Sequence, residues 1–163
     1  MAQWYCVGLE NRFPQGSPGS IPGLGVFNKG NDKMSISRRK GVAIIDTKKG
    51  ILVGAITDTY ILPGGGAKPW ESRKRAAIRE LYEETGLKTK KVEYLFKDVG
   101  IKWHNHKGKL VQNHSKIFLI EAEGIPKPCS EVRKIAFYKP GSKIKIGEGS
   151  KKIIEIYLSK YKK

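Results

Sequence analysis

The sequence is poor in cysteine. It holds two cysteines, Cys6 and Cys129, in 163 residues, which is too few for the disulfide framework of a small secreted domain. The first residues also lack the charged segment followed by an apolar segment that opens a secretory signal peptide. We therefore expect both cysteines to be reduced and the protein to be cytoplasmic.

Long hydrophobic runs are also missing. A membrane-spanning helix needs roughly 18–20 consecutive apolar residues, and no stretch of this chain approaches that length. Hydrophobic residues make up 39% of the chain and charged residues 29%, which is typical of a globular protein rather than a disordered one. A chain of 163 residues is long enough for one core of ordinary size but not for two. The sequence therefore predicts one globular domain with no membrane partner.

Acidic residues are scarce compared with basic ones. The chain carries 15 aspartates and glutamates against 32 lysines and arginines, for a formal net charge of +17. Such a surface attracts polyanions, either nucleic acid or a phosphate-rich small molecule. The excess of positive charge lies in residues 87–116 and 126–163, whereas residues 41–86 are nearly balanced. An ordinary solvated, lysine-rich surface is the alternative explanation of this distribution.

The first 33 residues lack any periodic hydrophobic pattern. They mix glycine, proline, serine and asparagine with scattered aromatic residues, and they show neither the period of a strand nor that of a helix. We expect residues 1–33 to be an irregular N-terminal extension, either disordered or the product of a start assigned too far upstream. Residues 34–163 are then the folded domain, because a strand pattern begins almost directly after Met34.

From Gly41 onward the pattern predicts a mixed α+β fold. Strands are expected over 41–46, 51–56, 91–103, 115–123 and 131–138. Hairpins are expected at 47–50, where Gly50 is suited to positive φ, and at 104–114. Helices are expected over 72–85 and 150–161, and Ser150 is the expected N-cap of the second helix.

The stretch LPGGGAKPWESRKRAAIRELYEETGL, residues 62–87, concentrates glycine and glutamate. At 100° per residue, the predicted helix places its apolar residues on one face and its carboxylates on the opposite face. The apolar face consists of Ile78, Leu81 and Tyr82, and the carboxylate face consists of Glu80, Glu83 and Glu84. Gly86 stands where a left-handed residue would end the helix.

Three neighbouring carboxylates repel one another unless a cation lies close to them. Arginines at 73, 75 and 79 supply that cation if the face is an ordinary salt-bridged surface. The glycines at 64, 65 and 66 favour a different interpretation, because they allow backbone groups to approach a ligand closely. Glycines followed by facing carboxylates suit Mg²⁺, which prefers oxygen ligands and phosphate oxygens.

The spacing of this stretch resembles the Nudix box. Five residues separate Gly65 from Glu71, and seven more lead to RELYEETGL, residues 79–87. No defining position departs from the family pattern, and the strand order expected from Gly41 onward is also similar to the Nudix fold. The resemblance implies an α/β/α sandwich with a mixed β-sheet and the Nudix loop-helix.

The resemblance also implies a reaction and a set of site residues. Nudix enzymes are hydrolases of phosphoanhydride bonds that use Mg²⁺, with Mn²⁺ as a substitute, to cleave nucleoside diphosphates linked to another group. The implied metal ligands are the Gly64 carbonyl and the carboxylates of Glu80, Glu83 and Glu84. Glu80 is alternatively the base that takes a proton from water, and Arg79 would orient the carboxylates. Gly65, Glu71 and Gly86 would have structural roles in the box.

Many family members use a further glutamate outside the box as the base or as an extra metal ligand. Glu131, ahead of the last expected strand, is our candidate, and Glu121 and Glu123 are alternatives. A plain surface charge is the competing interpretation of Glu131.

Four residues outside the carboxylate helix are candidates for substrate binding. Tyr94 and Trp103 could stack on a nucleobase, although core packing is the favoured explanation. Lys68 and Lys102 could contact phosphates as point charges, although a solvated basic surface also explains them.

Nucleoside triphosphates, deoxynucleoside triphosphates and dinucleoside polyphosphates are the substrates we favour, because basic segments suit long phosphate chains. A phosphorylated or capped RNA 5′ end is an alternative, which would make the protein a decapping enzyme with RNA as partner. A non-catalytic nucleotide-binding domain is a third interpretation. Dimers are frequent in the family, so a homodimer is also expected.

Overall fold

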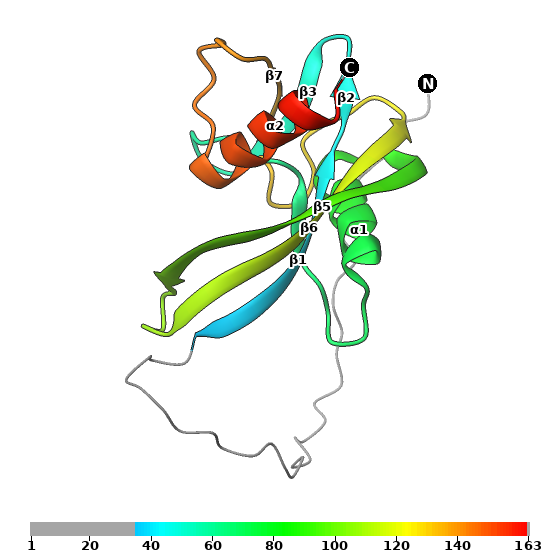
Figure 1. Ribbon diagram of the computed structural model, residues 1–163. Helices are drawn as coiled ribbons and strands as arrows, with labels where there is room; N and C mark the ends of the chain where they lie inside the picture. The colour runs from blue at the N-terminus through cyan, green and yellow to red at the C-terminus, as the bar shows by residue number, and fades with distance from the viewer. Residues whose placement is uncertain (1–34, 163) are drawn as a thin grey trace.

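The computed structural model describes residues 35–162 of the chain. The predicted extension, residues 1–33, lies outside the described residues and stays a prediction. The described part contains seven strands and two helices arranged as two sheets between two helices (Figure 1). None of its helices is long and apolar enough to cross a bilayer.

The larger sheet has the strand order β4-β1-β6-β5. Its strands are β1 (Ile36–Ile44), β4 (Gly64–Gly66), β5 (Lys88–His104) and β6 (Leu110–Glu123). β1 runs parallel to β6 and antiparallel to β4, so the sheet is mixed. The smaller sheet has the order β2-β3-β7, formed by β2 (Asp46–Thr47), β3 (Gly50–Ala55) and β7 (Lys134–Tyr138).

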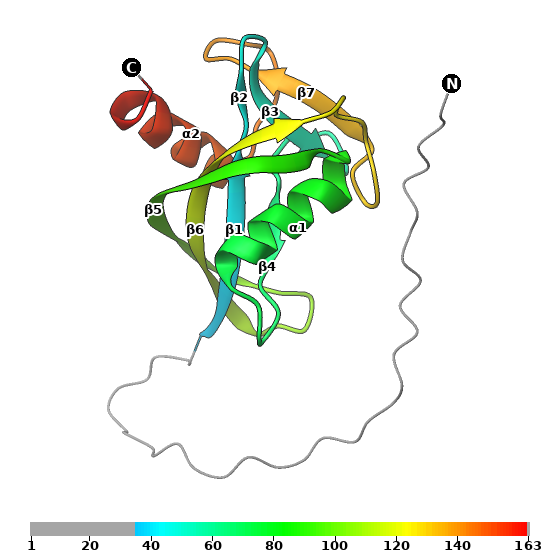
Figure 2. The same ribbon diagram turned by 90° about the vertical axis from the view of Figure 1, so that its right-hand side faces the viewer.

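Two helices cover opposite sides of the sheets, as the α/β/α prediction requires. They are α1 (Arg73–Thr85) and α2 (Glu148–Lys160), and Figures 1 and 2 show β1 and β6 passing between them. The buried hydrophobic residues form two clusters, one that includes residues of α1 (the α1 cluster) and one that includes residues of α2 (the α2 cluster). Successive residues of β1 alternate between these clusters, because side chains on a strand point to opposite faces in turn. Val42 and Ile44 pack in the α2 cluster, whereas Ala43 packs in the α1 cluster.

The first predicted hairpin exists, but it is shorter than expected. Only two residue pairs join β2 to β3, and the strand predicted over 41–46 divides at Ile45. β1 cannot pair with β3 because β6 and β4 already occupy its two sides. Gly50 has φ +127°, which confirms that the turn needs positive φ at this position.

Several predicted element starts are wrong. The strands predicted from 41, 91 and 115 begin earlier, at Ile36, Lys88 and Leu110. α2 begins two residues earlier than predicted, with Gly147 as its N-cap and no side-chain capping bond. Ser150 instead uses its hydroxyl oxygen to accept a hydrogen bond from the Leu62 amide at 2.9 Å. β7 begins at Lys134 rather than at 131, because the residues before it belong to a loop that contacts α1.

The prediction of reduced cysteines is wrong for Cys129, which is disulfide-bonded. The number of cysteines in a sequence does not say whether a particular thiol is bonded.

Candidate active site

The three glycines expected to form a loop are instead a short strand, β4, on the edge of β1. Hydrogen bonds from Ala43 to Pro63 and from Ala67 to Arg39 bracket this pairing. Since hydrogen-bonded and non-hydrogen-bonded pairs alternate in an antiparallel ladder, Gly64 and Gly66 direct their amide and carbonyl groups away from β1. The Gly64 amide donates to Glu84 Oε2 at 3.2 Å, and the Gly66 carbonyl accepts from Arg79 Nη2 at 3.1 Å.

Helix α1 lies close to β1 and β4 because two glycines provide the space. A Cβ on Gly41 would collide with the Arg73 carbonyl and would lie 2.6 Å from the Ala77 amide nitrogen. A Cβ on Gly65 would overlap the Glu80 carboxylate. The absence of side chains at these positions therefore lets the helix backbone contact β1 and lets Glu80 reach β4.

Both ends of α1 are capped by residues that the sequence supplies. The Ser72 hydroxyl accepts a hydrogen bond from the Arg75 amide at 3.1 Å, and Gly86 adopts φ +71° after the last turn. The positive φ of Gly86 confirms its predicted role. Tyr82 corrects the predicted apolar face: it is 55% exposed, and the buried face consists of Ala76, Ala77, Leu81 and Thr85.

Arg79 joins three glutamates of the box. Its Nε and Nη2 bind the two oxygens of Glu71 at 2.9 and 3.0 Å, and its Nη1 binds Glu80 Oε1 at 2.8 Å and Glu83 Oε2 at 2.9 Å. The hydrogen bonds from Arg79 hold the pKa of Glu71 below its ordinary value, although burial opposes this. They also raise the pKa of Arg79. A planar guanidinium with several fixed donors is suited to this arrangement.

Glu84 lies in a different electrostatic environment. The pKa of Glu84 is raised to about 7, chiefly by burial; the negative charges of Glu80 and Glu131 act in the same direction, whereas the Gly64 amide and the Lys40 charge oppose the rise. Its carboxylate therefore has two negative neighbours and no arginine partner of the kind that holds Glu71.

Lys40 is a site residue that the sequence analysis missed. Burial and the neighbouring Arg38 charge lower its pKa, and the carboxylates of Glu84 and Glu80 act in the opposite direction. A signal was present in the sequence, since Lys40 precedes Val42 and Ile44 at strand spacing and so shares their face. A lysine at the end of a buried strand face is unusual unless a charged partner lies near it.

The loop before β7 brings Glu131 toward α1. The amides of Lys127 and Cys129 donate to the carbonyls of Thr85 and Glu84, each at 3.1 Å. Ser130 has φ +54°, an uncommon value for a residue with a side chain, directly before the exposed Glu131. Glu131 is close enough to raise the pKa of Glu84.

The alternatives to Glu131 are occupied elsewhere. Glu121 pairs with Lys91 at 3.8 Å, and Glu123 pairs with Lys90 at 3.0 Å. Both pairs join β5 to β6, whereas Glu131 is one of the charges that raise the pKa of Glu84. The choice of Glu131 stays a prediction.

The four predicted substrate-binding residues do not form one group. Tyr94 is 48% exposed, and its ring lies edge-on to the buried ring of Phe118 with the ring centroids 5.8 Å apart, so the core packing that was the alternative explanation does not apply to it. Lys102 and Trp103 lie at the far end of β5, where they pair with Gln112 and Val111. Lys68 lies in a separate pocket beside Arg38 and Arg39.

The oxygen atoms around Glu84 suit a hard divalent cation. The donors that the box resemblance implies are the carboxylates of Glu80, Glu83 and Glu84, together with the Gly64 carbonyl, which faces away from β1. Within residues 35–162 no three acidic, histidine or cysteine side chains converge closely enough to form a preassembled metal cage, since Arg79 holds Glu80 and Glu83 by hydrogen bonds. Mg²⁺ fits such a donor set, because it retains several waters and uses few protein carboxylates.

Comparison with known proteins decides the family. The model of the NUDIX domain matches residues 35–155, which is most of the chain. The chain belongs to the Nudix hydrolase family. Its fold is therefore the α+β Nudix fold, as the box resemblance implied.

Solved structures agree with this assignment. A crystal structure from Chromobacterium violaceum, assigned to the Nudix hydrolase family, is 35% identical, with a TM-score of 0.64 over 77% of this chain and 79% of that chain. A bifunctional NMN adenylyltransferase/ADP ribose pyrophosphatase from Francisella tularensis, complexed with AMP and a manganese ion, is similar in fold. Its TM-score is 0.56 at 19% identity, over 78% of this chain and 43% of that chain.

Curated relatives match over a shorter stretch. Diphosphoinositol polyphosphate phosphohydrolase 3-alpha of Mus musculus is 54% identical over 33 residues. That stretch covers 20% of this chain and 20% of the mouse protein. Nudix hydrolases generally use divalent metals, and the Francisella tularensis structure contains one.

Proposed function

We propose that this Nudix hydrolase is a Mg²⁺-dependent pyrophosphohydrolase that cleaves the diphosphate linkage of a nucleoside diphosphate derivative. Nucleoside triphosphates, deoxynucleoside triphosphates and dinucleoside polyphosphates are its preferred substrates in this proposal. The observation that carries it is the approach of the α1 carboxylates to β4, where Gly64 binds Glu84 and Arg79 joins Glu80 and Glu83.

In this proposal Gly64, Glu80, Glu83 and Glu84 hold the divalent ion. When bound, the ion would neutralise phosphate charge and lower the pKa of a water molecule. Arg79 keeps Glu80 and Glu83 in position through its hydrogen bonds, so it is a positioning residue.

Glu131 is the proposed general base, because it is exposed and lies close to Glu84. It would accept a proton from water as the water oxygen forms a bond to phosphorus. The phosphorus–oxygen bond of the linkage breaks, and its electron pair leaves with the departing phosphate. Glu80 is the alternative base.

A hydrolysis screen over nucleotide substrates, with Mg²⁺ and with Mn²⁺, tests this function. Glu83→Gln should lower the rate roughly 100-fold or more, since loss of even an outer-shell partner of a metal site costs 10–100-fold. The matched control is Glu155→Gln, which alters an exposed carboxylate on α2 and should leave the rate unchanged. Turnover without a divalent metal, or unchanged turnover in Glu83→Gln, would contradict the proposal.

A diphosphoinositol polyphosphate is a second candidate substrate, favoured by the 54% identity over 33 residues to hydrolases of that name. The same screen separates the candidates when it includes such a compound. An RNA 5′ end is a third candidate, suggested by the net charge of +17. It predicts RNA binding that weakens steeply with salt, together with release of pyrophosphate or a capped nucleotide. A cytoplasmic location and a homodimer stay predictions.

A further inference from the structure

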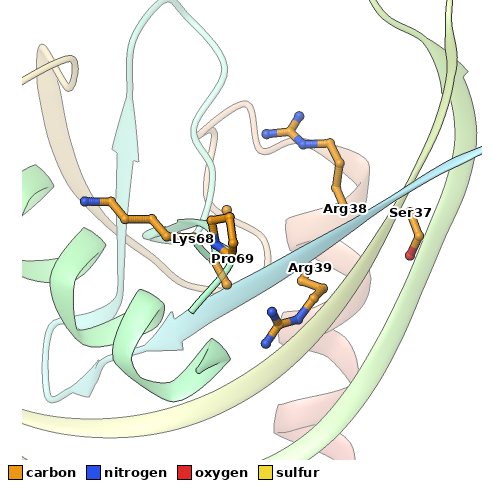
Figure 3. A pocket seen from close by; sticks show the side chains of 7 residues that line it. Ser37, Arg38, Arg39, Lys68 and Pro69 are labelled. Atoms are coloured by element: carbon orange, nitrogen blue, oxygen red, sulfur yellow. The ribbon is translucent and has the colours of Figure 1, made fainter. Parts of the chain in front are cut away.

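A cationic pocket lies next to the carboxylates of α1. It has a volume of about 380 Å³, between the first half of β1 and the segment that leads from β4 into α1 (Figure 3). Its lining includes Ser37, Arg38, Arg39, Gly66, Lys68 and Pro69. Figure 3 shows Arg38 and Arg39 leaving β1 in different directions, with Lys68 and Pro69 on the opposing segment.

The pocket exists because β4 is shorter than β1. β4 ends at Gly66, which pairs with Lys40, so the preceding residues of β1 have no strand on that side. The chain then turns away from the sheet. The Ala67 amide donates to the Arg39 carbonyl at 2.8 Å, and the Lys68 amide donates to Glu71 Oε2 at 3.1 Å. These bonds hold the two walls of the pocket in place.

Within the part of the chain that the structure describes, no carboxylate pairs with the positive charges of this pocket. Among residues 35–162, no ion pair involves Arg38, Arg39 or Lys68. Arg39 donates one bond, at 3.1 Å, to the backbone carbonyl of Glu71. The Glu71 carboxylate lies near Lys68, but both of its oxygens are bound by Arg79. Three cations around one concavity therefore favour an anionic ligand.

The pocket adjoins the candidate active site through Gly66. The Gly66 carbonyl accepts from Arg79, which binds Glu80 and Glu83. A Cβ on Gly66 would lie 3.8 Å from Arg38 Nη2, so the Arg38 guanidinium lies against the same residue. Lys40 lies on the same face of β1 as Arg38, since the two residues are two positions apart in the strand. A row of cations thus leads from the carboxylates through Lys40 to Arg38.

We propose that this pocket binds a phosphate group of the substrate beyond the diphosphate that is cleaved, so that the enzyme selects substrates with three or more phosphates. The inference rests on the proposed function, because the pocket is assigned relative to that site. Arginine suits this role, since its planar guanidinium can donate two parallel hydrogen bonds to one phosphate. Arg38 and Lys68 are specificity residues in this account.

Kinetics with substrates of different phosphate number tests the pocket. Diadenosine pentaphosphate has three phosphates more than ADP-ribose, which has only the diphosphate. In the double variant Arg38→Ala/Lys68→Ala, the KM for diadenosine pentaphosphate should rise at least tenfold more than the KM for ADP-ribose, as expected for the loss of two charge-assisted contacts. Equal increases in both KM values would overturn the proposal. The KM for an inositol polyphosphate that bears a diphosphate is measured for both proteins in parallel. It shows whether the pocket selects the phosphates of a nucleotide or also those of a substrate without a nucleoside.

A binding measurement decides the pocket independently of turnover. Calorimetry with inorganic tripolyphosphate on the full chain in EDTA should show a Kd at least tenfold higher for Arg38→Ala/Lys68→Ala than for the wild type. The control Lys48→Ala/Lys143→Ala removes the same charge from exposed positions elsewhere and should leave Kd unchanged. Equal weakening in both double variants would show only non-specific attraction and would overturn the pocket. If the wild type hydrolyses no substrate, the proposed function fails while this measurement still decides the pocket.

Discussion

At the scale of the residue, Glu84 combines burial with neighbouring negative charge. Its pKa is raised from 4.5 to about 7, so the folded protein holds a proton there that the unfolded chain has released. Stability of the metal-free protein therefore falls as pH rises from about 4.5 through about 7. A shift of this size corresponds to a decrease of about 3 kcal/mol in the free energy of unfolding across this pH range.

Glu84→Gln should abolish this pH dependence, because glutamine stays neutral and keeps an acceptor for the Gly64 amide. In EDTA, the variant should match the wild type at pH 5 and melt several degrees higher at pH 8. With Mg²⁺ present, the wild type should gain more thermal stability than the variant, since binding stabilises the folded state. Thermal melts at both pH values check the prediction.

Glu83→Gln is the control for Glu84→Gln, because Glu83 is exposed. A lower melting temperature for Glu84→Gln at pH 8 would contradict the prediction.

Also at the scale of the residue, the lack of a side chain at Gly65 leaves the space that the Glu80 carboxylate occupies. Gly65→Ala should lower kcat at least tenfold, because the added methyl group occupies the position of that carboxylate. The fold should persist, since the colliding atoms are the end of a flexible side chain. Steady-state kinetics together with a thermal melt measures both effects.

Gly66→Ala is the matched control for Gly65→Ala, because its Cβ would have only an ordinary contact at 3.8 Å. We expect it to lose much less activity. Similar losses of kcat in the two variants would show that Glu80 is not displaced by a side chain at 65.

At the scale of the element, the contact between β1 and α1 depends on Gly41. Gly41→Ala would place a methyl group against the helix backbone, at the Arg73 carbonyl and 2.6 Å from the Ala77 nitrogen. Backbone cannot move aside as a side-chain end can, so we expect a loss of about 2–3 kcal/mol in the free energy of unfolding. Urea titration measures this loss.

Gly149→Ala is the control for that experiment. Gly149 lies in the first turn of α2, and a Cβ there would meet nothing within 4 Å. Alanine favours a helix over glycine, so this variant should be slightly more stable. A neutral Gly41→Ala would show that α1 lies farther from β1 than the structure indicates.

At the scale of the whole molecule, both hydrophobic clusters lie between Val42 and Leu158. Deletion of residues 1–33 should therefore change the melting temperature by only a few degrees and leave kcat unchanged. The comparison is made in a reducing agent, so that the disulfide of Cys129 contributes to neither protein. Loss of cooperative unfolding in the shortened chain would show that the extension belongs to the folded domain.

Much of the candidate site could be predicted from the sequence, because its parts are local. Helix α1 follows from Ser72, the 3.6-residue period and Gly86, all within one stretch. The box spacing identified the family. The prediction that Tyr82 lies on the buried face was wrong. The helical period gives the direction of the apolar face but not the width of the contact between helix and sheet.

Sequence alone determined the family, the reaction class and the carboxylates of α1, since these depend on residues close together in the chain. Tertiary structure decided which distant residues join them. Lys40 reaches Glu84 because β4 pairs with β1, and Glu131 approaches it because the loop before β7 binds the end of α1. The cationic pocket exists only because β4 ends before β1 does. Such contacts depend on strand pairing and loop packing between remote segments, which local periodicity does not specify.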